Sequence, residues 1–449
     1  MISTFINAWK VADLRKKMLF TALIVLIFRI GAAIPVPFTN ISGDNGIIDP
    51  TGETFMNYLS MMTGEAFAYG TIFALSITPY INSSIIIQLL GVVIPALEKL
   101  SKEGEEGRKK IATITRYTTI GLALLQSTAY FIYLRAQGYV VTDAEGNLFT
   151  GFAAVLQGLA VILCLTAGSC FVMWLGEQVN EKGIGNGISI ILFAGIVSRI
   201  PSLITTLLGP TNGYISKGGA FIPMTIIVCI VLVLMIAFIV WMDNAERRIP
   251  VQYAKRVVGR KMYGGQSTHI PIKVNMSGVM PVIFASSILS LPPTIQMFVN
   301  VKEGSGWETF FSIFQATHPV YVVIYFVMII FFAYFYAQIQ YNPIEMANNI
   351  RKNSGAIPGI RPGKPTSDYI AKILSRLTLM GALLLSVVAL FPTVFSQIAT
   401  ACLKLGGVEE GLNISLGGTS IIIMVGVALE TVKQLESQMM MRHYKGFLD

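Results

Sequence analysis

The chain has 449 residues, of which 53% are hydrophobic and only 13% are charged, and its formal net charge is +9 at pH 7. Because a soluble domain is about one-quarter charged, this composition excludes an ordinary soluble enzyme or binding domain. It predicts a protein that crosses a membrane many times.

Ten stretches are apolar and long enough to cross a bilayer, which takes roughly 20 residues. Their expected ranges are 18–37, 71–95, 117–137, 153–176, 188–208, 221–242, 276–298, 319–340, 377–400 and 416–432. The segment before the first of them is amphipathic, ends in Arg15-Lys16-Lys17 and shows no cleavable signal pattern, so span 1 is expected to stay in the protein. The predicted fold class is an all-α polytopic membrane protein with ten transmembrane helices.

The basic residues predict the orientation of these spans. Most of the 33 Lys and Arg residues precede span 1, follow span 10, or lie in the loops between spans 2 and 3, 4 and 5, 6 and 7, and 8 and 9. Basic loops stay in the cytoplasm, so both termini are expected there. Arg29 and Glu430 are charges within spans, and each is expected to reach an interface by extending along its helix.

Catalytic and metal-binding patterns are weak. The stretch GIRPGKPT, 359–366, has the wrong glycine spacing for a phosphate loop, and GIGNG, 183–187, lacks a preceding strand. The three histidines show no metal-ligand spacing. The four cysteines, which are expected to be packing residues, are Cys164, Cys170, Cys229 and Cys402. We therefore expect no catalytic residue, no metal and no cofactor.

Ten spans divide into two sets of five, and any repeat of an odd number of spans must be inverted in the membrane. The stretches TPYINSSII, 78–86, and MPVIFASSIL, 280–289, share Pro-x-Ile followed by Ser-Ser and lie five spans apart. Chance could supply so short a match. Paired proline-interrupted spans nevertheless indicate a substrate path.

Three further segments predict function. The stretch 53–70 is too short to cross and is cut by Gly64-Glu65, so it is either a re-entrant segment or an ordinary amphipathic surface helix. The loops 243–275 and 341–376 mix apolar and basic residues and indicate docking sites for a protein or for ribosomal RNA.

Span 2 carries one stripe made of Ile77, Ile81, Ser84 and Gln88, at the 100° helical spacing. Polar groups in hydrocarbon are costly, so this stripe should face either a packed neighbouring helix or a water-filled path. Branched apolar residues also reach mid-membrane in spans 5, 7 and 10, as a constriction that closes by dewetting would require.

Six motifs, in this order, resemble the SecY family, which comprises the channel subunits of bacterial preprotein translocases and is homologous to the large subunit of the eukaryotic and archaeal translocon. They are FRIGAAIPVP, 28–37; ITPYINSSIIIQLL, 77–90; EKGIGNGISI, 181–190; RRIPVQYAKR, 247–256; QSTHIPIKVNMSGVMPVIFASSI, 266–288; and GIRPG, 359–363. The resemblance covers nearly the whole chain.

The resemblance implies an hourglass pore between two inverted, pseudo-symmetric halves, 1–210 with spans 1 to 5 and 211–449 with spans 6 to 10. A ring of apolar side chains is expected to close this pore. The pore ring consists of Ile77, Ile81, Ile188, Leu192, Ile283 and Ile423. Leu192 departs from the all-isoleucine pattern.

A plug at about 54–67 is expected to seat in the outer funnel. Its candidate residues are Thr54, Met56, Tyr58, Met61, Gly64, Glu65 and Phe67. Glu65 stands where the family often has a second glycine.

A lateral gate is expected between spans 2 and 3 and spans 7 and 8, held shut by a polar patch until an apolar signal helix replaces its contacts. The candidate residues of this patch are Asn82, Ser84, Gln88, Gln126, Asn186 and Asn275.

The two basic loops are expected to dock the SecA motor or the ribosome. The candidate docking residues are Arg247, Arg248, Lys255, Arg256, Arg260, Lys261, Arg351, Lys352, Arg361 and Lys364. The other implied partners are SecE, SecG, precursors with signal peptides, membrane lipid and ribosomal RNA.

The function that the resemblance implies is a passive, gated protein-conducting channel in the bacterial plasma membrane, with ATP hydrolysis in SecA. It would pass unfolded secretory polypeptides across the membrane and release membrane-protein helices laterally. A solute-coupled transporter is the alternative from a second class, but intramembrane charge pairs are missing. A membrane enzyme is a third alternative, without a catalytic constellation.

Overall fold

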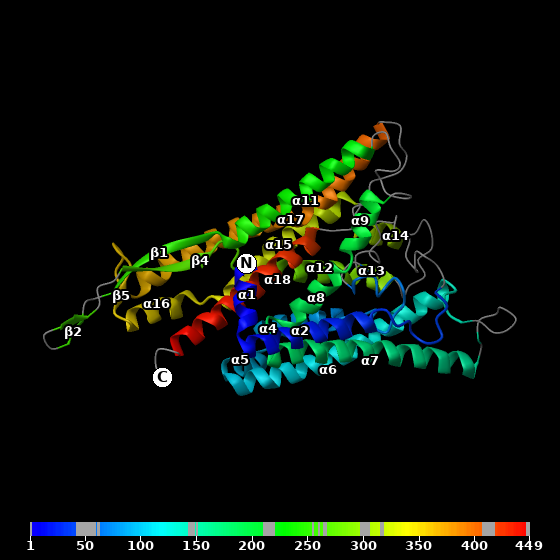
Figure 1. Cartoon of the computed structure of the whole chain (residues 1–449), viewed down its shortest axis with the longest axis horizontal. Helices are drawn as coiled ribbons and strands as arrows, with labels where there is room; N and C mark the ends of the chain where they lie inside the picture. Colours follow the sequence, from blue (N-terminus) through cyan, green and yellow to red (C-terminus); the bar gives the residue numbers. More distant parts are fainter. Residues whose placement is uncertain are drawn as a thin grey trace.

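The computed structural model describes residues 2–41, 60, 63–141, 149, 151–209, 221–253, 256–258, 261–263, 267–296, 306–314, 318–405 and 418–445. Most of this part of the chain is helical, and the helices form an elongated body (Figure 1). The structure confirms the predicted fold class, a helical membrane protein. Short strands are added in the two basic loops.

The first half of the chain contributes eight described helices. They are α1 (Ile2–Lys10), α2 (Ala12–Gly31), α4 (Thr78–Val93), α5 (Pro95–Lys102), α6 (Glu105–Ala136), α7 (Phe152–Lys182), α8 (Gly187–Val197) and α9 (Ile200–Leu208). Helices α6 and α7 lie side by side along the lower edge of Figure 1.

The second half begins with α11 (Phe221–Asn244) and continues with the strands β1 (Glu246–Tyr253), β2 (Arg256–Val258), β3 (Lys261–Tyr263) and β4 (Ser267–Lys273). The remaining elements are α12 (Met280–Leu289), α13 (Leu291–Gln296), α14 (Gly306–Ser312), α15 (Pro319–Gln340), α16 (Pro343–Lys352), β5 (Gly355–Ala356), α17 (Lys364–Leu405) and α18 (Gly418–Lys445). Helices α11 and α17 run together along the upper edge of Figure 1.

Six helices or joined helices among the described residues are long and apolar enough to cross a membrane, or seven if α4 and α5, bent by 106°, form one span. Three more predicted spans coincide with α2, α6 and α12. Four basic residues lie in α2, polar residues interrupt α6, and α12 has only 10 residues. The total of ten spans stays a prediction.

Several predicted spans are broken, and their boundaries differ from the sequence-based ranges. Span 2 was expected from 71, but α4 begins at Thr78 because residues 71–77 form turns. Span 5 is interrupted between α8 and α9, and span 7 between α12 and α13. Hydropathy alone does not register such breaks, because the residues in them are themselves mostly apolar.

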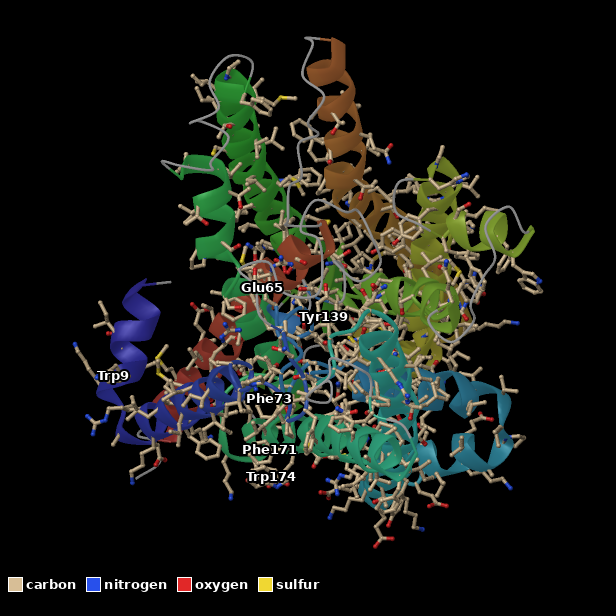
Figure 2. All side chains as sticks on the ribbon, turned by 90° about the vertical axis from the view of Figure 1, so that its right-hand side faces the viewer. Trp9, Glu65, Phe73, Tyr139, Phe171 and Trp174 are labelled. Atoms are coloured by element: carbon tan, nitrogen blue, oxygen red, sulfur yellow. The ribbon has the colours of Figure 1, made fainter. Side chains whose placement is uncertain are left out.

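The turn segment before α4 is held inside the protein. Its backbone pairs with the segment after α2, where Ile72 N donates to Ile34 O over 3.0 Å. The Phe73 ring stacks on Phe28 of α2 and on Phe171 of α7, each with centroids 6.0 Å apart. In Figure 2, Phe73, Phe171 and Trp174 follow one another from the interior to the edge of the molecule. These contacts set where α4 begins.

The largest apolar cluster of buried side chains joins helices from both halves: α2, α4, α7 and α8 with α11, α12, α15, α17 and α18. Within each half, the closest packing includes α4 on α6 and α12 on α15. The strongest contacts between the halves run through α18, which packs on α8 and on α1. The core therefore lies where the two halves meet.

The strands form a ribbon that extends away from the helical body, beside α16 (Figure 1). Strand β1 pairs with β4 in antiparallel register from Glu246↔Lys273 to Gln252↔Ser267. It also pairs with β5, which belongs to the second basic loop. The two loops therefore form one structural unit, which has its own small apolar cluster against α16 and α17.

The start of α8 depends on a glycine. A methyl group at Gly187 would lie only 1.9 Å from the backbone oxygen of Gly176 in α7. We expect Gly187→Ala to destabilise the protein by about 1–3 kcal/mol, because the two helices would have to separate. Gly121→Ala is the control, since a methyl group there meets nothing within 4 Å. Thermal unfolding in detergent measures the stability of both variants. Equal melting temperatures for Gly187→Ala and Gly121→Ala would contradict the close approach of α8 to α7.

Candidate functional site

The six residues of the predicted pore ring lie on four helices. Ile77 is the N-cap residue of α4 and Ile81 lies in its first turn, Ile188 and Leu192 lie in the first half of α8, Ile283 in the first turn of α12, and Ile423 near the start of α18. Five of them belong to the largest apolar cluster and are at most 8% exposed, and Ile188 is half-buried and packs against this cluster. The structure therefore places apolar residues of both halves in one cluster.

Equivalent helix starts bring two of these residues into place. Pro79 stands in the first turn of α4 and Pro281 in the first turn of α12. Proline is favoured there because it has no N–H group to leave unpaired. Ile81 and Ile283 each follow two residues later, so the same local geometry places one isoleucine in each half.

The start of α8 is held by two asparagines. The side chain of Asn186 accepts a hydrogen bond from Ile188 N over 3.1 Å, and Asn180 Oδ1 accepts one from Gly187 N over 2.7 Å. These bonds satisfy free N–H groups at a helix start. They position Ile188 and Leu192 on the turns that follow.

The six candidates for the polar gate patch are spread over four places. In α4, Gln88 Nε2 is 3.5 Å from Ser84 Oγ. Asn186 caps α8, and Asn275 Nδ2 donates to Asp243 Oδ1 over 2.8 Å at the junction of α11 with the segment before α12. Gln126 is half-buried in α6. Among the described residues, no hydrogen bond joins the α4 members to Asn186 or Asn275.

Asn82 is the buried member of this set. Its side chain is on α4, the residue is 8% exposed, and its Oδ1 has no hydrogen-bond partner among the described residues. The neighbouring Ser83 is fully buried as well, but its hydroxyl donates to Thr115 O of α6 over 2.8 Å. Ser83 therefore joins spans 2 and 3, whereas Asn82 is a buried amide with an unmet acceptor.

Part of the predicted plug is visible. The candidates Thr54, Met56, Tyr58 and Met61 lie outside the described residues. The described end, residues 63–67, contains Gly64, Glu65 and Phe67, and we call it the stem. The backbone oxygen of Phe67 accepts a hydrogen bond from Tyr130 Oη of α6 over 2.6 Å, and the two rings lie 4.6 Å apart.

The other side of the stem faces charged residues. Glu65 Oε1 lies 3.4 Å from Arg199 Nε, at the break between α8 and α9. Arg29 Nη1 of α2 donates to Ser198 Oγ over 2.9 Å. Arg29 therefore has a partner on the segment between α8 and α9, and its extension to an interface stays a prediction.

Sequence reasoning missed Arg199, Ser198 and Tyr130 as neighbours of the stem. One signal was available for Arg199, since it is a charged residue inside the predicted span 188–208. The contact itself joins positions 134 residues apart, and such a pairing leaves no local pattern. Figure 2 shows Glu65 near the middle of the molecule, in contrast to Trp9 and Trp174 at its edges.

The described candidate docking residues lie on β1, β2 and β3, on α16, at the start of α17, and, for Arg361, in the segment just before α17. Exposed members are Arg247, Arg248, Arg351, Lys352, Arg361 and Lys364. Arg248 Nη2 pairs with Glu246 Oε1 over 2.8 Å. Lys255 and Arg260 lie outside the described residues, and of Arg256 and Lys261 only the backbone, in β2 and β3, is described.

The chain is similar to known proteins along most of its length. Residues 71–432 match the family model described as SecY. A protein translocase subunit SecY from Streptomyces galbus is 42% identical over 460 aligned positions, covering 100% of both chains. One from Mycobacterium tuberculosis strain H37Rv is 43% identical, again over 100% of both chains.

Solved structures share the fold. A structure of a protein-conducting channel matches with a TM-score of 0.62 at 19% identity, covering 94% of this chain and 92% of that one. A structure from work on the SecY plug domain, described there as maintaining a membrane seal, matches with a TM-score of 0.61 at 19% identity. It covers 94% of this chain and 92% of that one. Sec61 in a canine ribosome-channel complex matches with a TM-score of 0.58 at 17% identity, covering 94% and 92%.

Asn82 and Ser83 give a paired test of the packing in span 2. Ser83→Ala should lower stability by about 1 kcal/mol, because it removes a buried hydrogen bond to α6. Asn82→Leu should keep or raise stability, since it removes a buried acceptor that has no partner among the described residues. Thermal unfolding in detergent compares the two variants. A larger loss of stability in Asn82→Leu than in Ser83→Ala would show that the Asn82 amide makes a stabilising contact, contrary to the structure.

Proposed function

The chain belongs to the SecY family, and from this premise we propose that it is a gated protein-conducting channel. It passes unfolded secretory polypeptides across the bacterial plasma membrane and releases membrane-protein helices laterally into the bilayer. The observation that carries this proposal is the gathering of the six pore-ring residues, from four helices and both halves, in or against one apolar cluster, with five of them buried.

Branched apolar side chains suit a constriction that must seal and yet release its cargo. They exclude water and ions when they close against one another, because a narrow apolar passage dewets. They also lack hydrogen-bonding groups, so an extended polypeptide finds no fixed partner in the ring. Four helices supply the side chains, so the ring widens when the halves move apart.

The proposed lateral gate lies between α4 and α6 on one side and α12 and α15 on the other. Each pair packs closely within its own half, whereas the strongest contacts between the halves run through α18 with α8 and α1. This distribution supports a molecule that is hinged along α18 and separates on the gate side. Within α4, Ser84 and Gln88 supply polar groups that an apolar signal helix would displace.

The proposed plug comprises residues at about 54–67. Its support is the stem, which lies between α6 and the break after α8. Both contacts come from the first half, so the plug of the closed channel would be seated on that half.

The strand unit supports a docking role for the two basic loops. Pairing of β1 with β5 joins the loops, and exposed arginines and lysines lie on both of them. Such groups bind acidic protein surfaces and phosphates. We propose that this unit receives a SecA motor or the ribosome on the cytoplasmic side, with both termini on the same side. SecE and SecG would complete the complex, and the energy would come from SecA or from protein synthesis.

Site-specific crosslinking tests the channel function. The four native cysteines are replaced, and one cysteine is placed at position 283 by Ile283→Cys. A secretory precursor is then stalled midway in vesicles that contain SecE and SecA. The account predicts a crosslink that requires both ATP and a functional signal sequence.

The matched control is Val233→Cys, on α11, where the native side chain is 67% exposed and should face lipid or a partner and not the cargo. If the precursor crosses efficiently but never meets position 283, the pore-ring assignment is wrong. If no precursor crosses with these partners, the channel function is contradicted for this complex.

A further inference from the structure

A small polar cluster lies on the side of the stem away from Tyr130. It contains Gly64 and Glu65 of the stem, Arg29 near the end of α2, and Ser198 and Arg199 between α8 and α9. Arg29 Nη1 donates to Ser198 Oγ over 2.9 Å and lies 3.5 Å from Gly64 O. Ser198 Oγ in turn donates to Gly195 O over 2.6 Å. Three separate segments therefore meet at the stem.

The backbone of the stem is shaped for this place. Gly64 has a φ of 64°, and a methyl group there would lie 2.6 Å from Ser198 Oγ and 2.7 Å from Gly195 O. Only glycine fits both the conformation and the space. Glu65 has a φ of 72°, which is unusual for a residue with a side chain. A strained conformation of this kind persists only when neighbouring contacts hold it.

The backbone of Glu65 is hydrogen-bonded to Ser60 O and Tyr69 N, and its side chain forms an ion pair with Arg199. The Arg199 side chain is 13% exposed and that of Glu65 is 32% exposed. Nε and Nη1 of Arg199 are buried without a hydrogen bond to any described residue, so the carboxylate at 3.4 Å is the charge that compensates them. Removing one member of a buried pair leaves the other charge uncompensated, which is strongly unfavourable.

The same break ends the helix that carries two residues of the predicted pore ring. Helix α8 carries Ile188 and Leu192 in its first half and ends at Val197, next to Ser198 and Arg199. On the opposite side, Tyr130 holds Phe67. The stem is thus fixed between α6 and the end of the helix that supplies two ring residues.

We propose that Glu65 and Arg199 form a positioning pair, an electrostatic latch that seats the plug stem against the broken fifth span and keeps the resting channel closed. Arg29 supports the latch by holding Ser198 and approaching the Gly64 carbonyl. The inference rests on the proposed channel function and extends it to these residues. Opening of the channel would separate the pair.

The test uses the chain together with SecE in planar bilayers, with no precursor present. Glu65→Gln and Arg199→Gln should each raise the resting ion current about tenfold, because each leaves its partner unpaired in the closed state. The charge exchange Glu65→Arg with Arg199→Glu should bring the current back toward the level of the unmodified chain. A purely space-filling role would not respond to restored charge.

Arg116→Gln is the matched control. Arg116 Nε pairs with Glu177 Oε1 over 2.7 Å, between α6 and α7 of the same half, and neither residue touches the stem. Its resting current should stay at the level of the unmodified chain. A rise equal to that of Arg199→Gln would show that loss of any ion pair opens the channel, and would overturn the proposal.

A second measurement covers the case in which a charge variant folds poorly. Glu65→Cys and Arg199→Cys are combined in the chain without native cysteines, and the two thiols are joined by a short, reducible bis-maleimide linker that replaces the reach of the two native side chains. Crosslinking should block precursor translocation, and reduction of the linker should restore it. Undiminished translocation through the crosslinked protein would overturn the latch.

Translocation by the unmodified chain separates this inference from the proposed function. If the unmodified chain transports the precursor but neither single variant raises the resting current, the latch fails and the channel stands. If the unmodified chain transports no precursor, the proposed function itself fails, and the latch fails with it.

Discussion

Backbone that is not helical at membrane depth must find its hydrogen-bond partners inside the protein, because hydrocarbon offers none. This constraint governs where the functional residues lie. The turns at 71–77 pair with the segment after α2, and the start of α8 is capped by Asn186 and Asn180. Helices that begin or break in the interior can therefore exist only where other parts of the protein surround them. Those places hold the apolar ring and the stem.

Two features would close the proposed pore, the apolar ring and the plug with its stem, and they are held by different kinds of contact. The proposed ring would close by apolar contact, which excludes water but has no preferred geometry. The stem is held by directed contacts, a hydrogen bond from Tyr130 and an ion pair with Arg199. Nondirectional contacts let a chain of any sequence pass, whereas directed contacts return the stem to one position. A channel for unfolded polypeptides needs both properties.

Much of the architecture could be predicted from sequence because it follows local patterns. The shared Pro-x-Ile of 79–81 and 281–283 indicates equivalent interrupted spans in the two halves, and α4 and α12 each begin at the residue before this proline. Long-range contacts could not be read in this way. The pairing of β1 with β5 joins loops about 100 residues apart, and nothing local marks Glu65 and Arg199 as partners. Asn186 was grouped with the gate, although an asparagine before an apolar helix also predicts the cap that the structure shows.

The most direct test of the central claim is the resting ion current of ring variants. Ile81→Asn and Ile283→Asn, alone and combined, place an amide in the apolar cluster at equivalent points of the two halves. The account predicts a resting current that rises with each substitution and most in the combined variant, because a wetted constriction conducts. Val233→Asn on the exposed face of α11 should leave the current unchanged. A combined variant that inserts normally and shows no greater current than the unmodified chain would contradict the assignment of these residues to the pore.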